Sequence, residues 1–312
     1  MSRILVTGAT GFIGSYVVRF LVTGGHHVSV LTRSSVSSVY LPEGVEQMVG
    51  DMRDQVSLRR AVQGVDTIVH LAGTAFGPRV STADPLGAAE VNLWGTLVLL
   101  EEARLAGVKR FLFASTCMVY GDAPAPFTPT SAVQPQTPYA LQKYQCELTL
   151  KQYAKLYGME TLSLRLFNVY GVGMHETQGW KPVTLIFLER FKQGSLLTVE
   201  GDGLQTRDFV HVEDVARAFL NACNSSQAFQ GECLNVASGV STSMLEFARA
   251  FGGVIEHTPA RTVGNVPVTV ADISDTQALL QWSPSVSIQE GIRALCQEAE
   301  ACDECQDSGC VQ

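Results

Sequence analysis

The sequence predicts an α/β protein built on a doubly wound parallel sheet, and three observations indicate this fold class. Seven short apolar runs alternate with longer segments of helical periodicity. The runs are continuously apolar, as in strands that helices cover on both faces. A glycine-rich turn follows the first run directly. The predicted strands are RILVTG, HVSVLT, VEQMVG, DTIVHLA, RFLFAS, TLSLRLF and ECLNVA.

The helices between these strands are expected to start at recognisable caps. An Asp, Ser or Thr near a helix start accepts hydrogen bonds from backbone N–H groups that have no partner inside the helix. We predict helices that follow Gly11, Asp54, Asp84, Thr137, Pro182, Glu213, Ser241 and Ser287.

The chain is less regular from about Val172 onward, with the turn EGDG and the proline-containing stretch HTPARTVGNVPV. The segments RDFVHVEDVARAF and GECLNVA then return to the strand and helix pattern. We therefore expect a sheet domain at 1–171 and about 207–237, a smaller interleaved C-terminal lobe at 172–206 and 238–295, and a polar, cysteine-containing tail at 296–312. A ligand is expected between the lobes, beyond the carboxyl ends of the strands.

Composition and charge exclude several classes of function. A formal net charge of −8 and a pI near 5.3 are not the basic balance of a nucleic-acid-binding protein, so no nucleic-acid partner is expected. No apolar stretch approaches the ~18 residues of a membrane span. The N-terminus MSRILVTG enters a strand pattern without a secretory signal. We expect a cytoplasmic protein with no membrane partner.

The eight cysteines do not indicate a disulfide framework. Four lie in apolar segments and are interpreted as small buried side chains, and four crowd into the tail. Cys302 and Cys305 have the spacing of half a zinc site, but no second close pair and no nearby histidine accompany them. We predict no metal site and a mobile tail with oxidisable thiols.

The turn GATGFIG predicts a dinucleotide-binding site of the Rossmann type. Gly8, Gly11 and Gly14 stand three residues apart between the first strand and a helix. Glycines permit the tight turn and let the backbone approach a pyrophosphate. The helix start at Phe12 and Ile13 adds N–H groups with partial positive charge. We expect NAD or NADP to bind here.

The end of the second predicted strand favours NADP over NAD. An acidic residue at this point would bind the adenosine ribose of NAD, but Thr32 stands there, followed by Arg33 and two serines. These donors suit a 2′-phosphate. The alternative is that Arg33 is a solvated loop charge, in which case NAD binds through its diphosphate.

Two further turns complete the expected cofactor site. Asp51 and Met52 in GDMRD are expected near the adenine, after the third strand. Leu71, Ala72 and Gly73 in HLAG follow the fourth strand and bring backbone close to the cofactor.

Tyr139 and Lys143 in YALQK are the candidate reacting groups. They are four residues apart and share one face of a predicted helix. A phenol titrates near ~10, but an adjacent ammonium and a cationic nicotinamide favour the phenolate. Tyr139 then exchanges a proton with a substrate hydroxyl while hydride moves between carbon and nicotinamide. Lys143 is also expected to hold the nicotinamide ribose.

Eight motifs together resemble the extended short-chain dehydrogenase/reductases, and more narrowly their NAD(P)-dependent sugar-nucleotide epimerases and dehydratases. The motifs are TGATGFIG, GDMRD, HLAG, VNLWGT, ASTCMVYG, YALQK, RLFNVYG and RDFVHVEDVARA, and the resemblance covers about residues 2–295. It implies that Thr116 hydrogen-bonds the reacting oxygen, with Tyr139 as acid and base and Lys143 as its partner.

The resemblance also implies contacts around these residues. Asn92 takes the place of an Asn that supports the region of the Tyr139 helix. Asn168, Arg207 and Arg261 match positions that contact the diphosphate of a nucleotide sugar. The chain departs from the family after Arg261, where Gly264 and Asn265, with one extra residue before them, stand in place of the common Gly-Asp pair. The helices around 84–106 and 137–157 correspond to a pair that builds a homodimer.

Cys117 and Met118 distinguish between activities within the family. In relatives that eliminate water, these positions are typically Asp and Glu, and decarboxylating relatives usually carry Glu at the second. A thioether transfers no proton, and a thiol is a poor substitute for a carboxylic acid. The resemblance therefore implies a 4-epimerase of an NDP-hexose. The alternatives are an NADPH-dependent reductase of a 4-keto sugar nucleotide or other carbonyl, a dehydratase, and a cofactor-sensing protein without catalysis.

Overall fold

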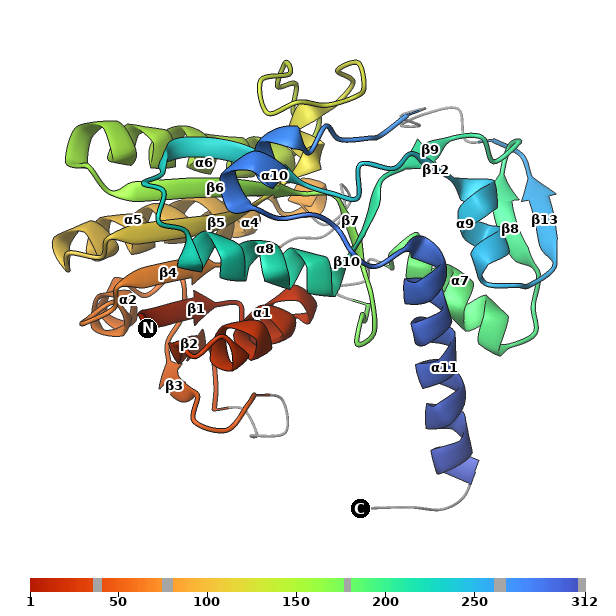
Figure 1. The fold of residues 1–312 in the computed structure, drawn as a ribbon, viewed down its shortest axis with the longest axis horizontal. Helices are drawn as coiled ribbons and strands as arrows, with labels where there is room; N and C mark the ends of the chain where they lie inside the picture. The colour runs from red at the N-terminus through yellow and green to blue at the C-terminus, as the bar shows by residue number, and fades with distance from the viewer. Residues whose placement is uncertain (36–40, 75–80, 177–180, 261–267, 308–312) are drawn as a thin grey trace.

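A seven-stranded parallel sheet forms the centre of the protein, which confirms the predicted fold class. The computed structural model describes residues 1–35, 41–74, 81–176, 181–260 and 268–307. The strand order is β3-β2-β1-β4-β5-β6-β11, and every neighbouring pair is parallel (Figure 1). The seven predicted runs supply these strands: β1 (Arg3–Thr7), β2 (His27–Thr32), β3 (Glu46–Val49), β4 (Thr67–His70), β5 (Arg110–Thr116), β6 (Glu160–Leu166) and β11 (Gln230–Val236).

The strand order reverses between β1 and β4, which lie side by side although β2 and β3 intervene in the sequence. Thr7 and His70 are register partners at the carboxyl ends of these two strands. The chain leaves such a pair toward opposite sides, and the crevice that opens there is where doubly wound sheets bind ligands.

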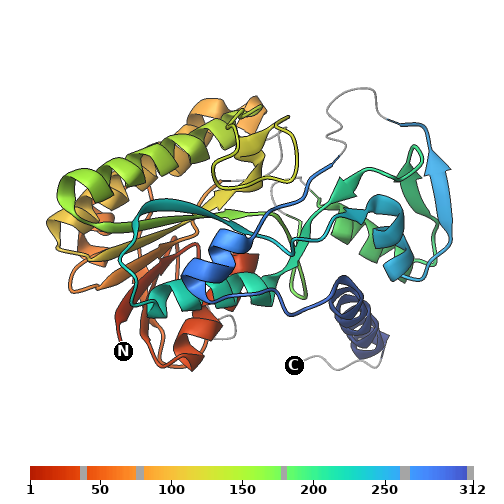
Figure 2. The ribbon, with the colours of Figure 1, turned by 45° about the horizontal axis from the view of Figure 1, so that its top comes forward.

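Helices cover both faces of the sheet (Figures 1 and 2). One face shares a core with α1, α8 and α10, in which Val17, Phe219 and Leu280 are buried. The other face shares a core with α2, α5 and α6, in which Leu99 and Phe111 are completely buried. The bounds are α1 (Phe12–Thr23), α8 (Val212–Asn224), α10 (Ser274–Leu280), α2 (Gln55–Ala61), α5 (Thr96–Leu105) and α6 (Pro138–Tyr157).

Six of the eight predicted helices begin directly after the predicted residue. Side chains cap four of these, with Asp54, Asp84, Thr137 and Ser287 accepting from backbone N–H groups of the first turn. Ser287 caps α11, and the other two helices are α1 and α7. The added bounds are α4 (Pro85–Ala89), α7 (Val183–Lys192) and α11 (Ile288–Asp307).

Two predicted helix starts are wrong by two residues. α8 begins at Val212 because the imidazole of His211 caps it, with Nδ1 accepting from the Glu213 N–H at 3.4 Å. α9 (Met244–Ala250) begins after Ser243, which forms a reciprocal capping box with Glu246. The sequence analysis also missed α10 and the π-helical segment η2 (Glu90–Gly95) between α4 and α5.

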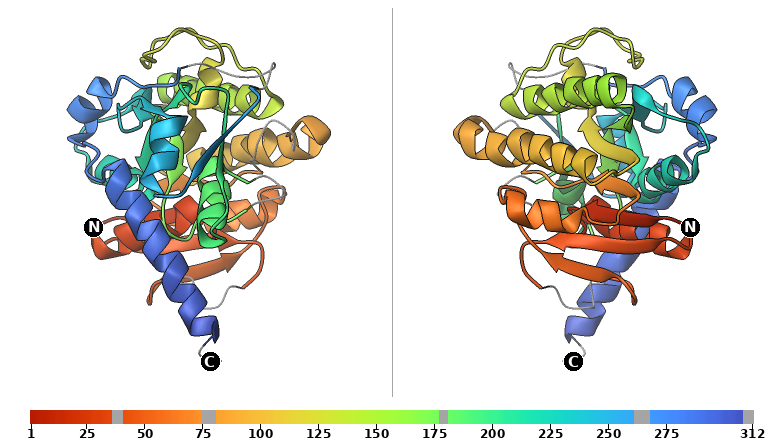
Figure 3. Two further views of the ribbon diagram at one scale, coloured as in Figure 1. Left: turned by 90° about the vertical axis from the view of Figure 1, so that its right-hand side faces the viewer. Right: turned by 90° about the vertical axis from the view of Figure 1, so that its left-hand side faces the viewer.

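A third apolar cluster holds together the part of the molecule at the right of Figure 1. There β8 (Leu197–Glu200) pairs in parallel with β13 (Ile255–Thr258). Phe187 on α7 packs against Phe247 on α9 and Phe251, with ring centroids 5.9 and 5.8 Å apart. α11 packs against α7 and α9 and crosses the outside of this region (Figure 3).

Short strands connect this region to the large sheet. β7 (Asn168–Tyr170) pairs in parallel with β10 (Phe209–His211), and β9 (Thr206–Arg207) pairs antiparallel with β12 (Thr242–Ser243). The chain therefore crosses between the two regions several times, so the smaller region is interleaved with the sheet.

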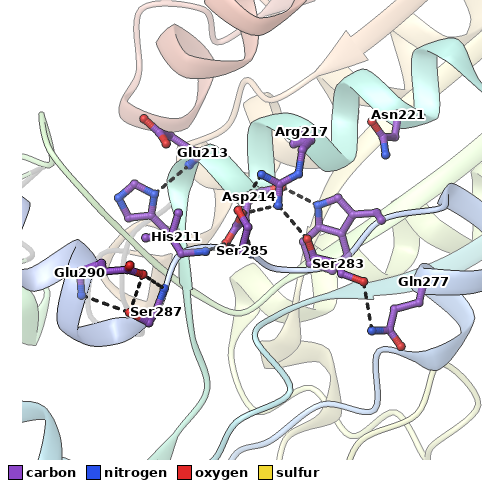
Figure 4. A network of polar contacts seen from close by, with 12 residues as sticks. His211, Glu213, Asp214, Arg217, Asn221, Gln277, Ser283, Ser285, Ser287 and Glu290 are labelled. Atoms are coloured by element: carbon purple, nitrogen blue, oxygen red, sulfur yellow. Dashed lines mark hydrogen bonds and ion pairs between the residues drawn. The ribbon is translucent and has the colours of Figure 1, made fainter.

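A buried carboxylate ties α8 to the segment that leads into α11 (Figure 4). Asp214 is completely buried and accepts hydrogen bonds from Arg217, from the Ser285 N–H and hydroxyl, and from the Val286 N–H. Its backbone carbonyl accepts from the Trp282 indole at 2.8 Å. We call these five residues the Asp214 network.

The expected mobile tail is partly wrong, since α11 continues through residue 296 to Asp307. The repeated polar and apolar residues of this stretch extend the helix, and Cys296 packs at the edge of the third apolar cluster. No helix in the described ranges combines the length and the hydropathy of a membrane span.

Candidate active site

The glycine-rich turn brings β1, β4 and α1 into contact that side chains would prevent. Gly8 has a φ of +74°, and a Cβ there would lie 2.6 Å from the Ala72 nitrogen. A Cβ on Gly14 would lie 2.8 Å from the Ala9 Cα. Side chains at either position would force the turn open, so the glycines are required by close approach as well as by backbone conformation.

The start of α1 forms a cradle for an anion. Gly11 provides no side-chain cap, and the first N–H groups of a helix, here those of Phe12, Ile13 and Gly14, have no intrahelical partner. The helix dipole adds partial positive charge at the same place. These features fit the diphosphate of a dinucleotide.

Two buried hydroxyls near this cradle also point to a missing ligand. Thr32 Oγ1 ends β2 and Thr74 Oγ1 follows the HLAG turn, and among the described residues neither has a hydrogen-bond partner. Buried hydroxyls are normally bonded, so polar atoms of a bound molecule would satisfy them. The observed site therefore fits a dinucleotide cofactor.

The predicted adenine and ribose contacts lie at the ends of β2 and β3. Asp51 accepts from Arg53 Nε and Nη2, both at 2.9 Å. This hydrogen bonding, with the charge of Arg33 as a smaller contribution, lowers the pKa of Asp51 to about 2. Met52 is buried against Gly95, and Arg33 is exposed.

Lys143, the residue expected to hold the nicotinamide ribose, is buried against β5. Its Nζ donates to the Ala114 carbonyl at 2.8 Å and lies 4.5 Å from the centroid of the Phe113 ring. Burial lowers the pKa of Lys143 to about 8. A Cβ on Gly73 would lie 3.7 Å from this Nζ and 3.0 Å from Asn92 Oδ1, so the three residues converge.

Tyr139 is half-buried on the face of α6 that also carries Lys143, but the pKa of its phenol does not shift in the expected direction. Burial raises the pKa of Tyr139 above its usual range, and Cys117 contributes in the same sense. Lys143 Nζ lies 5.8 Å from the centroid of the Tyr139 ring and binds the Ala114 carbonyl. Desolvation therefore outweighs the ammonium, and the phenol stays protonated without a further cation.

Thr116 ends β5 at the start of a 3₁₀ turn, η3 (Cys117–Tyr120). Its Oγ1 accepts from the Met118 N–H at 3.2 Å. Burial raises the pKa of Cys117 to about 12, with Asp208 adding to the effect and Arg207 opposing it. The thiol is thus protonated at neutral pH, and the fold brings Arg207 to the Thr116–Cys117 turn.

The predicted diphosphate contacts differ in how the structure holds them. Arg207 Nη1 donates to the Thr206 carbonyl at 2.7 Å. The Asn168 amide donates to the Asp208 carbonyl at 2.9 Å, so it joins β7 to β10. Arg261 lies outside the described residues.

Sequence reasoning missed three buried polar residues around the site. Asp208 accepts from the N–H groups of Ser238, Gly239 and Ala271 and from the Ser238 hydroxyl. Glu147 pairs with Arg165 at 2.7 Å and accepts from Ser115. The third is His70.

A polar residue inside a continuously apolar run is the signal that was overlooked. His70 in TIVH and Arg165 in ETLSLRL both stand in such runs. Burial without a partner would be costly there, so a polar partner has to be present.

A cavity of about 660 Å³ lies elsewhere, between the outer face of α6, β11 and α10. None of the predicted site residues lines it, although Glu147 and Arg165 do. It is therefore separate from the site at the carboxyl edge of the sheet.

The fold and this site together define a dinucleotide-dependent α/β enzyme with a Tyr and Lys pair on one helix. Comparison with known proteins places it within that class. The model of the NAD dependent epimerase/dehydratase family matches residues 4–237, and the chain belongs to this family.

Individual relatives share nearly the whole chain. The sequence is 34% identical to a UDP-glucose 4-epimerase of Erwinia amylovora, over 93% of this chain and 95% of the relative. A crystal structure of a UDP-glucose 4-epimerase from Thermotoga maritima with UDP-glucose has a TM-score of 0.85 and 32% identity, and covers 96% of this chain and 99% of its own. The crystal structure of the UDP-glucose 4-epimerase of Thermus thermophilus in complex with NAD has a TM-score of 0.81 and 34% sequence identity. The similarity covers 99% of this chain and 100% of the Thermus chain.

Proposed function

We propose that this protein is a nucleotide-sugar 4-epimerase that acts on a UDP-hexose. The observation that carries the proposal is that Tyr139 and Lys143 stand on one face of α6, with Gly73 next to the buried Lys143 and Cys117 close enough to influence the half-buried Tyr139. The family and the activity named for the similar proteins support the same function.

A proton and a hydride must leave the same carbinol and return to it. When bound, the nicotinamide ring supplies reversible hydride acceptance at sugar C4. Tyr139 takes the proton of the C4 hydroxyl and later returns it to the same oxygen, and Thr116 holds that oxygen by a hydrogen bond. Because burial keeps the phenol protonated, a cationic ring next to it is needed to favour the phenolate.

The residues after Thr116 limit the reaction to this exchange. Met118 has no ionisable proton, and the Cys117 thiol is protonated at neutral pH. Neither removes the proton at C5, so neither of these two positions supplies a base for the elimination of water. The sugar re-accepts hydride on its opposite face, and no net oxidation results.

We propose NAD as the cofactor. The sequence favours NADP through Thr32 and Arg33, but the family description and the Thermus structure with NAD give no support to that preference. Thr32 is buried and Arg33 is exposed, which is compatible with the alternative that Arg33 is a solvated loop charge. Gly8, Gly11 and Gly14 hold the diphosphate, Asp51 and Met52 face the adenosine, and Leu71, Ala72, Gly73, Asn92, Tyr139 and Lys143 surround the nicotinamide ribose in this proposal.

The smaller lobe, residues 172–206 and 238–295, is proposed to bind the nucleotide sugar against the sheet domain. Arg207 supports this because its guanidinium is held next to the Cys117 turn, where burial lowers its pKa. Asn168 and Arg261 are the other proposed diphosphate contacts. The cytoplasmic location predicted from the sequence stays a prediction.

We also propose a homodimer formed through α4, η2, α5 and α6. Large apolar side chains are exposed along these helices, with Leu86 79%, Trp94 62% and Leu156 65% exposed. Leu141 and Leu148 on α6 are also exposed and stand seven residues apart, on the same side as Leu156. Exposed apolar rows of this kind mark protein interfaces.

The experiment starts with the purified protein. Its bound dinucleotide is released by denaturation and identified by mass, and the protein is then incubated with UDP-glucose, UDP-N-acetylglucosamine and UDP-glucuronic acid. A product of unchanged mass that NMR identifies as the 4-epimer, formed without added NADPH, is expected. Stoichiometric NADPH consumption would establish the reductase instead, and a product lighter by one water would establish a dehydratase.

A further inference from the structure

His70 is completely buried at the end of β4, and no step of the proposed reaction uses it. Its ring stacks on Phe113, with centroids 5.7 Å apart, and meets Phe111 edge-on at 5.9 Å. Both ring nitrogens have hydroxyl partners. Nδ1 lies 2.6 Å from Thr7 Oγ1, and Nε2 lies 2.8 Å from Thr96 Oγ1.

The direction of these hydrogen bonds follows from the other partners of the hydroxyls. Thr96 Oγ1 donates its only proton to the Asn92 carbonyl at 2.7 Å, so it accepts from His70 and Nε2 carries the proton. Burial lowers the pKa of His70 to about 3, with the charge of Lys143 as a smaller contribution, so the ring is neutral. Nδ1 is then an acceptor, and Thr7 Oγ1 donates to it.

The chain of hydrogen bonds begins and ends at the cofactor site. The Ala72 N–H donates to Thr7 Oγ1 at 3.2 Å, directly across from Gly8. At the other end, Asn92 binds both the N–H and the carbonyl of Thr74 at 2.8 Å. Asn92 Nδ2 also donates to Gln142 on α6 at 2.9 Å, and Gln142 stands between Tyr139 and Lys143.

We infer that His70 is a positioning residue that couples the dinucleotide cradle to the catalytic helix. It does so as the neutral Nε2–H tautomer, through a one-way hydrogen-bond chain from Ala72 through Thr7, His70 and Thr96 to Asn92, which we call the His70 chain. The Ala72 N–H at one end and the Asn92 carbonyl at the other fix the directions of the end bonds, and a single proton on His70 Nε2 is the arrangement that fits both. The inference rests on the proposed function only in that the site binds a nicotinamide dinucleotide.

The test measures NAD binding to cofactor-free protein by calorimetry, which needs no sugar turnover. His70→Phe keeps an aromatic ring between Phe111 and Phe113 but removes both hydrogen bonds, and should weaken NAD binding about tenfold or more. His70→Gln supplies one acceptor and one donor and should restore most of the loss. If NAD affinity in folded His70→Phe stays within about twofold of the unmodified protein, the inference fails.

Thr161→Val is the matched control, since it also deletes a buried hydroxyl from a strand of the same sheet. Thr161 Oγ1 donates to the Leu150 carbonyl at 2.9 Å, and no hydrogen bond among the described residues joins this hydroxyl to the His70 chain. The melting temperature should fall while NAD affinity changes less than about twofold. If this control loses as much NAD affinity as His70→Phe, the weaker binding comes from a general loss of stability, and the inference is overturned.

Two further measurements apply even if His70→Phe does not fold. Thr7→Val and Thr96→Val should each weaken NAD binding, and the double variant should lose less than the product of the two, because the second change falls on a broken chain. Nitrogen NMR of histidine-labelled protein should show His70 protonated at Nε2 alone. Multiplicative losses or a proton on Nδ1 would contradict the inference, whichever sugar the enzyme uses.

Discussion

Two buried polar clusters, the His70 chain and the Asp214 network, satisfy their members in different ways. The His70 chain is uncharged and passes from one donor to one acceptor at each step. In the Asp214 network several donors converge on one carboxylate. They are the Arg217 guanidinium on α8 and, in the segment before α11, the Ser285 hydroxyl and the backbone N–H groups of Ser285 and Val286.

The difference indicates what each cluster contributes. A carboxylate with several donors holds two segments together firmly, whatever the exact angle of each bond, so it mainly stabilises the fold. A one-to-one chain transmits position, because moving one member misaligns the next. We therefore expect changes in the Asp214 network to alter unfolding and changes near the His70 chain to alter binding and catalysis.

Tyr139→Phe should give the largest effect, and Tyr139 stands on α6 three residues before Gln142, which binds Asn92 of the His70 chain. Removing the hydroxyl deletes the acid and base, so kcat should fall by about 10³ while the melting temperature hardly changes. Steady-state epimerisation and thermal unfolding measure the two. Full turnover in this variant would remove the basis of the catalytic proposal.

Asp214→Asn should destabilise the protein by about 3 kcal/mol, because an amide N–H₂ then faces N–H donors in a buried site. Activity per folded molecule should be unchanged. Urea unfolding measures the loss, and Glu213→Gln, an exposed neighbour on α8, is the control. Loss of activity without loss of stability would reverse the comparison between the two clusters.

His70→Gln should reduce the sensitivity of the fold to acid. The folded pKa of His70, about 3, lies below the unfolded value of 6.5. The unfolded chain therefore binds more protons between these values, and stability falls by about 1.4 kcal/mol per pH unit as the pH drops below 6.5. Between pH 7 and pH 5, the free energy of unfolding of the variant should therefore fall by about 2 kcal/mol less than that of the unmodified protein. Parallel stability profiles of the two proteins would show that His70 is not buried and neutral.

Arg33→Ala should have the smallest effect. If Arg33 is a solvated charge, NAD affinity should change by less than about twofold. NADP affinity is the sharper measurement, because only a 2′-phosphate would lose an ion pair. The NADP preference expected from the sequence would be restored by two results together: the unmodified protein binds NADP more tightly than NAD, and Arg33→Ala greatly weakens NADP binding.

The sheet and most helix starts follow from the sequence because each depends on local information. Apolar runs such as that around Val69 must be covered on both faces, and a cap such as Asp54 bonds residues only two and three positions away. The short strands β7, β8 and β9 and the helix α10 escape such reasoning because distant segments define them. β9, for example, exists through its pairing with Thr242 and Ser243.

The helix that carries Tyr139 and Lys143 was predictable from the sequence, but the electrostatics of these two residues were not. The four-residue spacing of Tyr139 and Lys143 correctly places both on one face of α6. The pKa directions depend on burial from β5 and on the Ala114 carbonyl that accepts from the Lys143 ammonium, and these come from residues far along the chain. The same holds for the Asn168 amide, which binds Asp208 across 40 positions.

The π-helical segment η2 places one more residue in its turn than an α-helix would. Since an α-helix advances about 100° per residue, deleting that residue would rotate everything before it relative to everything after it. Asn92 would then lose its inward direction, or Trp94 and Leu86 would lose their outward one. The same irregular turn thus sets the angle between the buried side of this helical stretch and its exposed apolar side, and neither side can be changed alone.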